Sequence, residues 1–256
     1  MKIGFIGAGK MASAIIKGVK AKPFTVIISD RDPETSQAAA ERLGVKAAQS
    51  HQELADEADF IILGVKPQII ETVLAHLKID KPLMSMAAGV SLDRLSTLTN
   101  PNLPLIRIMP NLNAQILKST TAICGNQHVS EQLMTTAKTI TDCFGTTFEL
   151  PEKDFDTFTA LAGSSPAYVY LFIEALAKAG VKYGLNKKQA LEIITQTVLA
   201  SSQNLWLGTD SPNDLIDSIS SPGGTTIAGL LDLEKSGFTA ALVSGIDATI
   251  AKAKEL

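Results

Sequence analysis

Residues 1–14 read MKIGFIGAGKMASA, and they are the most informative segment of the chain about its fold. A short apolar run, Lys2–Ile6, leads directly into a G-x-G-x-x-A turn that opens a helix. Gly7 permits the tight strand-to-helix turn, Gly9 lets the backbone approach a pyrophosphate, and Ala12 lets the helix pack closely on the strand. The helix start offers N–H groups and a positive dipole end to an anion. The turn therefore predicts a dinucleotide site, with these candidate residues: Ile6, Gly7, Ala8, Gly9, Lys10 and Met11.

The composition indicates a folded protein in a reducing compartment. The chain has 256 residues, of which 45% are hydrophobic and 19% charged, and a formal net charge of −3. This composition supports a core, and the absence of a basic tract excludes nucleic acid as an expected partner. No uninterrupted apolar stretch reaches about 18 residues, so we expect no membrane span. We expect Cys124 and Cys143 to be buried free thiols of a cytoplasmic protein, and the scattered histidines predict no metal site.

Strands and helices alternate over residues 1–150. This alternation predicts a parallel sheet covered by helices on both faces, which is a Rossmann-type dinucleotide-binding domain. Asp32 with Pro33 begins one helix, and Ser91 caps another. The expected strands are Lys2–Ile6, Thr25–Ser29, Asp59–Gly64, Leu83–Ala87, Leu105–Met109, Thr121–Gly125 and Thr146–Leu150.

Residues 151–256 read as helices only, and we place the domain boundary near Leu150. The helix starts are expected at Ser165, Asn186, Ser211, after Gly224, and at Thr239, which we expect to cap the last helix. The segments 167–181 and 240–251 are apolar nearly all round, and a helix of that kind needs burial on every side. A domain of this size hardly encloses two such helices alone, so we expect a homodimer or larger assembly built through the helical half.

The second strand ends in Ser29, Asp30 and Arg31, about 20 residues after the glycine turn. An acid at this position bonds the adenosine ribose hydroxyls in NAD sites, whereas a nearby arginine accommodates a 2′-phosphate in NADP sites. The hydroxyl of Ser29 is a further phosphate-bonding candidate. Because Asp30 also reads as a simple turn residue, these positions leave the choice between NADP(H) and NAD(H) open.

Further cofactor contacts are expected where other strands end, because ligands of open α/β sheets bind beyond the carboxyl ends of the strands. Asn111 offers amide donors and an acceptor, which suit either a nicotinamide carboxamide or a backbone clamp. The candidates at these strand ends are Val65, Lys66, Pro67, Ala87, Ala88, Gly89 and Asn111.

A second anion site is predicted at residues 220–226, which read SSPGGTT. Two glycines at a helix start, with hydroxyls on both sides, form a cradle of N–H groups that suits a carboxylate or a phosphate. A simple helix cap needs one serine or threonine rather than this whole cluster. The candidates here are Ser221, Gly223, Gly224, Thr225 and Thr226.

Taken together, these segments resemble pyrroline-5-carboxylate reductase. The matching segments are GFIGAGKMASAI (4–15), VKPQ (65–68), SMAAGVSL (85–92), RIMPN (107–111), ALAGSSPAYVYLFIEALAKAGVKYGL (160–185) and SPGGTTIAGLLDLEKSGF (221–238). The resemblance spans essentially the whole chain, and the two segments from the helical half are the most specific. It implies NAD(P)H-dependent reduction of the C=N bond of 1-pyrroline-5-carboxylate to L-proline, the last step of proline biosynthesis. It also implies a dimer with interlocked helical domains that assembles into a decamer.

The resemblance assigns roles to the second cradle. The substrate carboxylate is expected on the N–H groups of Gly223, Gly224 and Thr225, and the Thr226 hydroxyl is expected to bond the ring nitrogen as the catalytic contact. The chain has Ser165 where the family commonly has glycine, and Asp30 where many members have asparagine. The Asp30 difference loosens the usual preference for NADPH and leaves NADH open.

Two other functions share parts of this pattern. A 3-hydroxyacid dehydrogenase shares the domain order and uses a helical lysine, for which Lys178 and Lys182 are available, but the Pro-Gly-Gly-Thr-Thr loop speaks against it. A non-catalytic nucleotide sensor is expected to have a damaged substrate loop, and this loop is intact.

Overall fold

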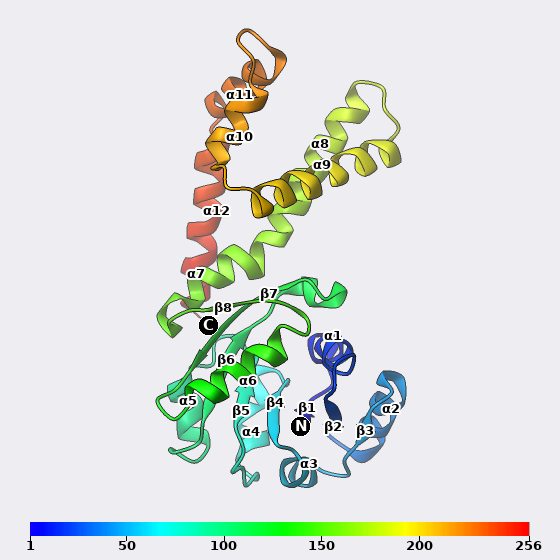
Figure 1. Ribbon diagram of the computed structural model, residues 1–256, viewed down its shortest axis with the longest axis vertical. Coiled ribbons are helices and arrows are strands. Elements are labelled where there is room, and N and C mark those ends of the chain that lie inside the picture. Colours follow the sequence, from blue (N-terminus) through cyan, green and yellow to red (C-terminus); the bar gives the residue numbers. More distant parts are fainter. Residues whose placement is uncertain (256) are drawn as a thin grey trace. The chain divides into compact units, whose positions relative to one another are not determined.

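The computed structural model describes residues 1–255, which form two compact units (Figure 1). The first unit comprises Met1–Gly163 together with the end of the chain from Ala253, and the second comprises Ser164–Lys252. Residues 151–163 follow the boundary expected from the sequence, yet they belong to the first unit. The reason is that Phe155 and Phe158 are buried in its core.

The first unit contains, within the described residues, one eight-stranded sheet with the strand order β3-β2-β1-β4-β5-β6-β7-β8. The order reverses its direction at β1, the strand that ends in the glycine turn. The strands are β1 (Lys2–Ile6), β2 (Thr25–Ser29), β3 (Lys46–Ala47), β4 (Phe60–Leu63), β5 (Leu83–Ser85), β6 (Leu105–Met109), β7 (Ser119–Gly125) and β8 (Gly145–Glu149).

The sheet departs from the expected all-parallel arrangement in one place, because β7 runs antiparallel to β6. Only residues 110–118 join these two strands, and they form a short 3₁₀ helix, Leu112–Ile116. A parallel connection needs a crossover of a dozen or more residues, so this linker is too short for one. The two-residue strand β3 was not expected from the sequence, whereas β1, β2 and β6 have the expected bounds.

Two buried clusters fill the two faces of the sheet. Helices α1 (Lys10–Val19), α2 (Pro33–Leu43) and α6 (Glu131–Thr141) pack on one face. Helices α3 (His51–Glu57), α4 (Ile70–Leu74), α5 (Leu92–Leu98) and α7 (Phe155–Phe158) pack on the other. The Rossmann-type expectation is confirmed by this arrangement. Side-chain caps begin several of these helices, and both expected caps, Asp32 and Ser91, are present.

The second unit consists of helices. They are α8 (Ser165–Lys182), α9 (Lys187–Leu207), α10 (Pro212–Ile219), α11 (Thr225–Lys235) and α12 (Phe238–Ala253). Helices α8 and α9 form a hairpin in which Glu174 pairs with Lys187 at 2.6 Å. The Thr239 cap predicted for the last helix is wrong, because α12 begins at Phe238 and Thr239 lies inside its first turn. Gly237, with φ +76°, turns the chain there instead.

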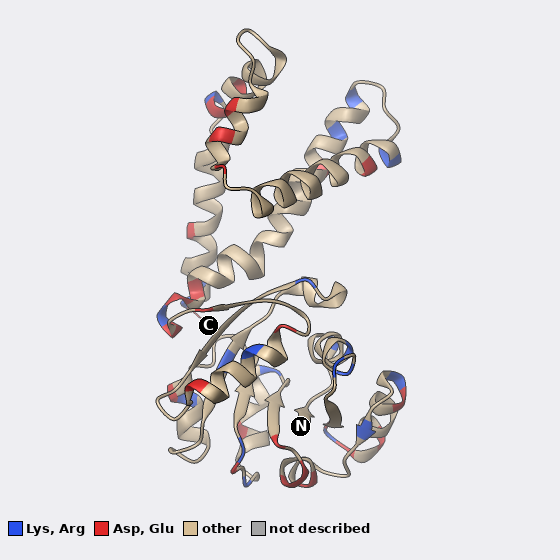
Figure 2. Ribbon diagram, viewed as in Figure 1, with Lys and Arg blue, Asp and Glu red and all other residues tan. Residues whose placement is uncertain are grey.

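The helices of the second unit expose most of their apolar side chains. Among residues 164–252, only Ala177 and Ala190 are buried. Tyr170, Leu171 and Trp206 are 55%, 70% and 69% exposed. Figure 2 shows long stretches of these helices without charged residues. Apolar surface of this extent marks an interaction surface.

The helical run Glu152–Lys182 is long and apolar enough, by length and composition alone, to cross a membrane. It has 31 residues and a mean hydropathy of 1.2 in its most apolar window. From the sequence we expect no membrane span, because no uninterrupted apolar stretch reaches about 18 residues. A helix that is buried between protein subunits has the same composition.

Candidate active site

The glycine turn has the geometry that its sequence predicts. Gly7 has φ +91°, and a Cβ atom there would lie 2.9 Å from the Gly64 carbonyl oxygen. Its N–H donates to the Ser29 carbonyl at 2.7 Å, which ties the end of β1 to the end of β2. By contrast, apart from Gly9 itself and its two chain neighbours, no heavy atom lies within 4 Å of where a Cβ of Gly9 would be. The turn is therefore closed on the protein side at Gly7 and open to a ligand at Gly9.

Helix α1 packs closely on the neighbouring strand end. Ala12 is 1% exposed, and its Cβ lies 3.1 Å from the position that a Cβ of Gly64 would occupy. A larger residue at either position would push the helix start away from the sheet. No side chain caps α1, because its N-cap residue is Gly9. The donor set and the space beyond Gly9 thus fit a pyrophosphate.

Asp30 reaches back to this turn. Its Oδ2 accepts a hydrogen bond of 2.9 Å from the Ala8 N–H, and its Oδ1 accepts one of 2.8 Å from the Arg31 N–H. The Arg31 side chain is 82% exposed and pairs with Asp32 at 3.0 Å. The acid at the end of β2 is therefore fixed against the turn, whereas the arginine beside it lies in solvent.

Ser29 does not have the surface position that a phosphate contact requires. Its side chain is fully buried, and its hydroxyl lies 2.7 Å from Nδ1 of His51. Burial lowers the pKa of His51, and the Asp30 carboxylate opposes that shift. This position disfavours the predicted contact between Ser29 and a phosphate, because the buried hydroxyl of Ser29 is already bonded to the half-buried His51.

Arg42 is a residue at the turn that sequence reasoning missed. Its Nη2 lies 3.5 Å from the Ala8 carbonyl oxygen and 3.4 Å from the Ser13 hydroxyl. It comes from the last turn of α2, and no sequence motif connects it with residues 7–12. Long side chains of a helix point back toward its N-terminus, which brings the Arg42 guanidinium to the start of α1.

The other strand-end candidates lie beyond β4 and β5. Strand β4 is a direct neighbour of β1, and β5 is the next strand, so their carboxyl ends share an edge with the glycine turn. Lys66, Pro67, Ala88 and Gly89 are exposed there; Val65 is half-buried, and Ala87, at 3% exposed, is part of the core. Gly89, with φ +75°, allows the turn after β5.

Asn111 forms the backbone clamp, which was one of its two sequence interpretations. It is 5% exposed. Its Nδ2 donates to the Ala162 carbonyl at 2.9 Å, and its Oδ1 accepts from the N–H groups of Asn113 and Thr120 at 3.2 Å. These bonds engage both the Nδ2 and the Oδ1 atom of the amide. Few hydrogen-bonding positions of the side chain therefore remain for a nicotinamide carboxamide.

The second cradle lies in the second unit. Gly223 has φ +68°, and the Gly224 N–H donates to the Ser221 carbonyl at 2.9 Å, which forms a tight turn before α11. Gly224 is the N-cap of α11, and no side chain caps this helix. By contrast, Asn186 and Ser211 cap α9 and α10. The simple-cap interpretation of this sequence required a side chain bonded to the first N–H groups of α11. No such cap is present, so these N–H groups are not taken.

Ser220 opens the predicted motif 220–226, although it is not one of the candidate ligands named there. Its hydroxyl oxygen is buried and has no hydrogen-bond partner. It directly precedes the cradle, where Ser221 and Thr225 are exposed and Thr226 is half-buried. A run of serines in a loop gives no signal about which hydroxyl is buried, so only the tertiary structure identifies it.

Metal-binding groups and reactive thiols were sought in the described part of the chain. Among residues 1–255, no group of three or more His, Cys, Asp or Glu side chains could hold a metal ion. Both cysteines are free and buried, as expected. Burial, assisted by the Glu152 carboxylate, raises the pKa of Cys124 to about 12, so its thiol is not a nucleophile.

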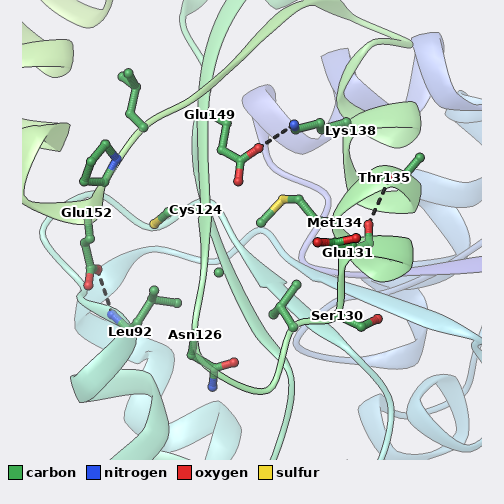
Figure 3. A pocket seen from close by; sticks show the side chains of 14 residues that line it. Leu92, Cys124, Asn126, Ser130, Glu131, Met134, Thr135, Lys138, Glu149 and Glu152 are labelled. Carbon is green, nitrogen blue, oxygen red and sulfur yellow. Dashed lines mark hydrogen bonds and ion pairs between the residues drawn. The ribbon is translucent and has the colours of Figure 1, made fainter.

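A hollow of about 710 Å³ lies beyond the ends of β7 and β8 (Figure 3). Glu131, Glu149 and Glu152 line it together with Lys138, which pairs with Glu149 at 2.5 Å. None of the residues of the glycine turn lines it. Glu152 pairs with Arg107, which lies outside the lining. This hollow is therefore lined by side chains with structural partners and is not part of the candidate active site.

Comparisons with known proteins match this geometry. Residues 152–256 match the family model for pyrroline-5-carboxylate reductase dimerisation, and residues 2–89 match a model described as NADP oxidoreductase, coenzyme F420-dependent. A pyrroline-5-carboxylate reductase of Aquifex aeolicus is 37% identical over all of this chain and 97% of its own length. The chain belongs to the pyrroline-5-carboxylate reductase family.

Solved structures of pyrroline-5-carboxylate reductases agree with this assignment. The enzyme of Streptococcus pyogenes is 61% identical, with a TM-score of 0.92 over 100% of this chain and 99% of its own. The Plasmodium falciparum enzyme, solved with NADP bound, is 30% identical, with a TM-score of 0.87 over 100% and 97%. The expected family, fold and oxidoreductase class are confirmed, as is a nicotinamide cofactor of the NADP(H) type.

The dimerisation match also accounts for the exposed helices. The match covers the whole second unit. The helical half of the chain therefore serves self-association, as in its pyrroline-5-carboxylate reductase family. The helices that are apolar nearly all round then find their partner surface in another copy of the chain.

Proposed function

We propose that this chain reduces the C=N bond of 1-pyrroline-5-carboxylate to give L-proline, with NADP(H) or NAD(H) as cofactor. The observation that carries the proposal is the uncapped start of α11 at Gly224. A small substrate with one carboxylate needs an anion cradle besides the cofactor turn, and this helix start provides N–H donors without any cation. The family membership of the chain supports the same reaction.

The cofactor residues of the proposal lie at the carboxyl edge of the sheet. The turn from Ile6 to Met11 holds the pyrophosphate, with Lys10 exposed beside it. Asp30 and Arg31 meet the adenosine ribose, and the segments 65–67 and 87–89 line the nicotinamide half. When bound, the nicotinamide supplies the hydride that the imine carbon accepts. Ser29 and Asn111 act indirectly, because their side chains hold protein groups.

The substrate residues of the proposal lie at residues 221–226. The N–H groups of Gly223, Gly224 and Thr225, with the hydroxyl of Ser221, hold the carboxylate. Thr226 donates or accepts a hydrogen bond at the ring nitrogen and so orients the imine. Its hydroxyl is a weak acid, so its contribution is orientation rather than proton supply.

Lys178 and Lys182 do not take the part that a hydroxyacid dehydrogenase would give them. Lys178 pairs with Glu174 at 3.6 Å, and its side chain is 73% exposed. The Lys182 ammonium lies 5.4 Å from the ring centre of the exposed Tyr183. Both are surface lysines of α8, which favours the imine reductase over that alternative.

The proposal also covers the roles of the two parts of the chain and the assembly that they form. Residues 1–150 bind the dinucleotide, and residues 151–256 bind substrate and form the dimer, which assembles further into a decamer. The protein acts in the cytoplasm, without nucleic acid or membrane as partner. The extent of exposed apolar surface on α8, α9 and α12 supports burial in such an assembly. Light scattering tests it: a stable and active monomer contradicts both dimer and decamer.

The activity test follows the oxidation of NADPH and NADH with 1-pyrroline-5-carboxylate as substrate. Thr226→Ala is expected to lower kcat/KM by about 10²-fold, while Thr226→Ser retains most of the activity, because only the alanine variant loses the hydroxyl. Thr239→Ala in the first turn of α12 is the matched control and is expected to have no effect. No turnover with either cofactor sinks the proposed reaction, and an unaffected Thr226→Ala enzyme removes the role of Thr226.

A further inference from the structure

The hydroxyl of Ser220 is buried, although the residues that follow it are exposed. Among residues 1–255, its oxygen is the one buried side-chain nitrogen or oxygen atom without a hydrogen-bond partner. Ser221 and Thr225, further along the loop, are exposed. A buried hydroxyl without a partner destabilises the conformation that contains it. The loop as it stands in the free chain therefore holds one group whose bonding is incomplete.

Ser220 is fixed by its backbone at the end of α10. Its N–H donates to the Asp217 carbonyl at 3.1 Å, and the residue directly precedes the Ser221–Gly224 turn. By contrast, Ser218 on the same helix is exposed, and its hydroxyl donates to the Leu215 carbonyl at 2.7 Å. The hydroxyl two residues earlier thus has the kind of partner that the Ser220 hydroxyl lacks.

The turn after Ser220 already uses one donor of the cradle. The Gly224 N–H donates to the Ser221 carbonyl at 2.9 Å. A Cβ atom at Gly224 would overlap with the Ser221 hydroxyl, so Ser221 is folded over the start of α11. Apart from Gly223 itself and its chain neighbours, no heavy atom lies within 4 Å of where a Cβ of Gly223 would be. The loop is therefore open at Gly223 and closed at Gly224.

A carboxylate that binds at this helix start competes with the turn. When it accepts from the Gly224 N–H, the Ser221 carbonyl loses its donor and becomes a free acceptor. A serine hydroxyl can reach the carbonyl of the next residue, as that of Ser119 does with Thr120 at 3.4 Å. We infer that Ser220 is a positioning residue of the substrate loop, whose hydroxyl donates to the Ser221 carbonyl once a carboxylate occupies the Gly224 N–H. This inference rests on the proposed function.

The exchange leaves every polar group of the loop bonded in the occupied state. In the free loop the turn bond is made and the Ser220 hydroxyl is unpaired. In the occupied loop the carboxylate accepts from the N–H, and the hydroxyl donates to the carbonyl. Because only the free loop carries an unpaired hydroxyl, the exchange favours the occupied loop. Ser220 acts through the Ser221 carbonyl, so it affects substrate binding rather than hydride transfer.

The deciding variant is Ser220→Ala, measured in the full chain with saturating NADPH. We expect KM for 1-pyrroline-5-carboxylate to rise about five- to tenfold and kcat to change by less than about twofold, because the released Ser221 carbonyl then has no donor. The affinity for NADP⁺ and the resistance to urea are expected to be unimpaired. Ser220→Thr keeps a hydroxyl and is expected to keep KM within about twofold of the wild type.

Ser218→Ala is the matched control, because it removes an exposed hydroxyl of α10 outside the loop. It is expected to leave KM unchanged. Titration calorimetry with L-proline in the presence of NADP⁺ gives a readout that does not depend on turnover, and Ser220→Ala is expected to lower this affinity about five- to tenfold. L-Prolinamide, which lacks the carboxylate, is expected to bind the wild type and Ser220→Ala equally weakly.

The outcomes separate the two claims. An unchanged KM and an unchanged L-proline affinity in Ser220→Ala overturn the role of Ser220. A variant that loses stability and NADP⁺ affinity to the same degree also overturns it, because the hydroxyl is then part of the fold. A wild-type chain that binds L-proline and shows the Ser220 effect, but does not reduce the imine, keeps this role and overturns the proposed function. A wild-type chain that binds neither L-proline nor the imine overturns both.

Discussion

The side-chain amide of Asn111 donates a hydrogen bond of 2.9 Å to the backbone carbonyl of Ala162, 51 residues further along the chain. This bond joins the end of β6 to the π-helical segment Thr159–Ser164, which continues into α8. Such a segment leaves carbonyl groups without regular helical partners, and Asn111 satisfies one of them. The strand end that approaches the active site is therefore anchored by its own asparagine.

We expect Asn111→Ala to lower the free energy of unfolding by about 2–3 kcal/mol, because it leaves the Ala162 carbonyl and two N–H groups without their partner. Urea denaturation measures this loss. Asn111→Asp keeps the acceptor but sets a carboxylate against the carbonyl of Ala162, so it is expected to be at least as destabilising. If Asn111→Ala had normal stability but bound the cofactor more weakly, Asn111 would instead be a cofactor ligand.

Arg107 and Glu152 form a shielded ion pair at 2.8 Å, with side chains 12% and 28% exposed. Glu152 also accepts from the Leu92 N–H, and the Arg107 guanidinium lies 4.7 Å from the ring centre of Phe155. A double-mutant cycle with Arg107→Met and Glu152→Gln is expected to give a coupling energy of about 1–2 kcal/mol.

The Arg94–Glu71 pair is the control for this cycle. Its distance is 2.7 Å, but its side chains are 54% and 68% exposed. We expect its coupling energy to stay below about 0.5 kcal/mol, because solvent screens the charges. Equal couplings in the two pairs would show that burial does not govern them.

Gly18→Ala tests the packing of α1. Alanine normally stabilises a helix interior by about 1 kcal/mol relative to glycine. Here the added Cβ would overlap with the carbonyl oxygen of Cys143, which belongs to the backbone and cannot turn aside. We expect a loss of about 2–4 kcal/mol in thermal or chemical unfolding. Lys17→Ala, one residue earlier on the exposed side, is expected to be neutral, and a stabilised Gly18→Ala protein would refute the close approach.

The pH dependence of stability should carry a contribution from His51. Burial holds its pKa in the folded chain below the usual 6.5. Its contribution is therefore fully present above the unfolded pKa and is lost as the pH falls through the folded pKa. Unfolding free energies from about pH 7.5 down to about pH 5 should fall less steeply in His51→Gln than in the wild type. Parallel curves for the two proteins would show that His51 does not contribute.

Two serines test the worth of a buried hydroxyl. Ser29→Ala removes the partner of His51 Nδ1 and should cost about 1 kcal/mol. Ser220→Ala removes a buried hydroxyl that has no partner, so it should leave stability unchanged or raise it by about 1 kcal/mol. Chemical denaturation of both variants measures this difference. A clear loss of stability in Ser220→Ala would mean that its hydroxyl bonds a group in the assembled protein.

Local patterns predicted the elements of this protein well. The strands Lys2–Ile6, Thr25–Ser29 and Leu105–Met109 have the expected bounds, since short apolar runs between turn signals leave few alternatives. The caps at Asp32 and Ser91 and the helix start at Ser211 are also as expected, because capping depends on residues three apart. The error at Thr239 has the same origin: a glycine turn at Gly237 starts that helix without needing a side-chain cap.

The glycine turn, the order of the elements and the Pro-Gly-Gly-Thr-Thr loop can be read from the amino-acid sequence, because each depends on residues that are neighbours along the chain. The antiparallel direction of β7, the bond from Asn111 to Ala162 and the bond from Ala8 to Asp30 became apparent in the folded chain alone. These contacts join residues far apart in sequence, and their partners are backbone groups that every residue carries. A side-chain pattern cannot specify which backbone group lies opposite until the sheet brings the two together.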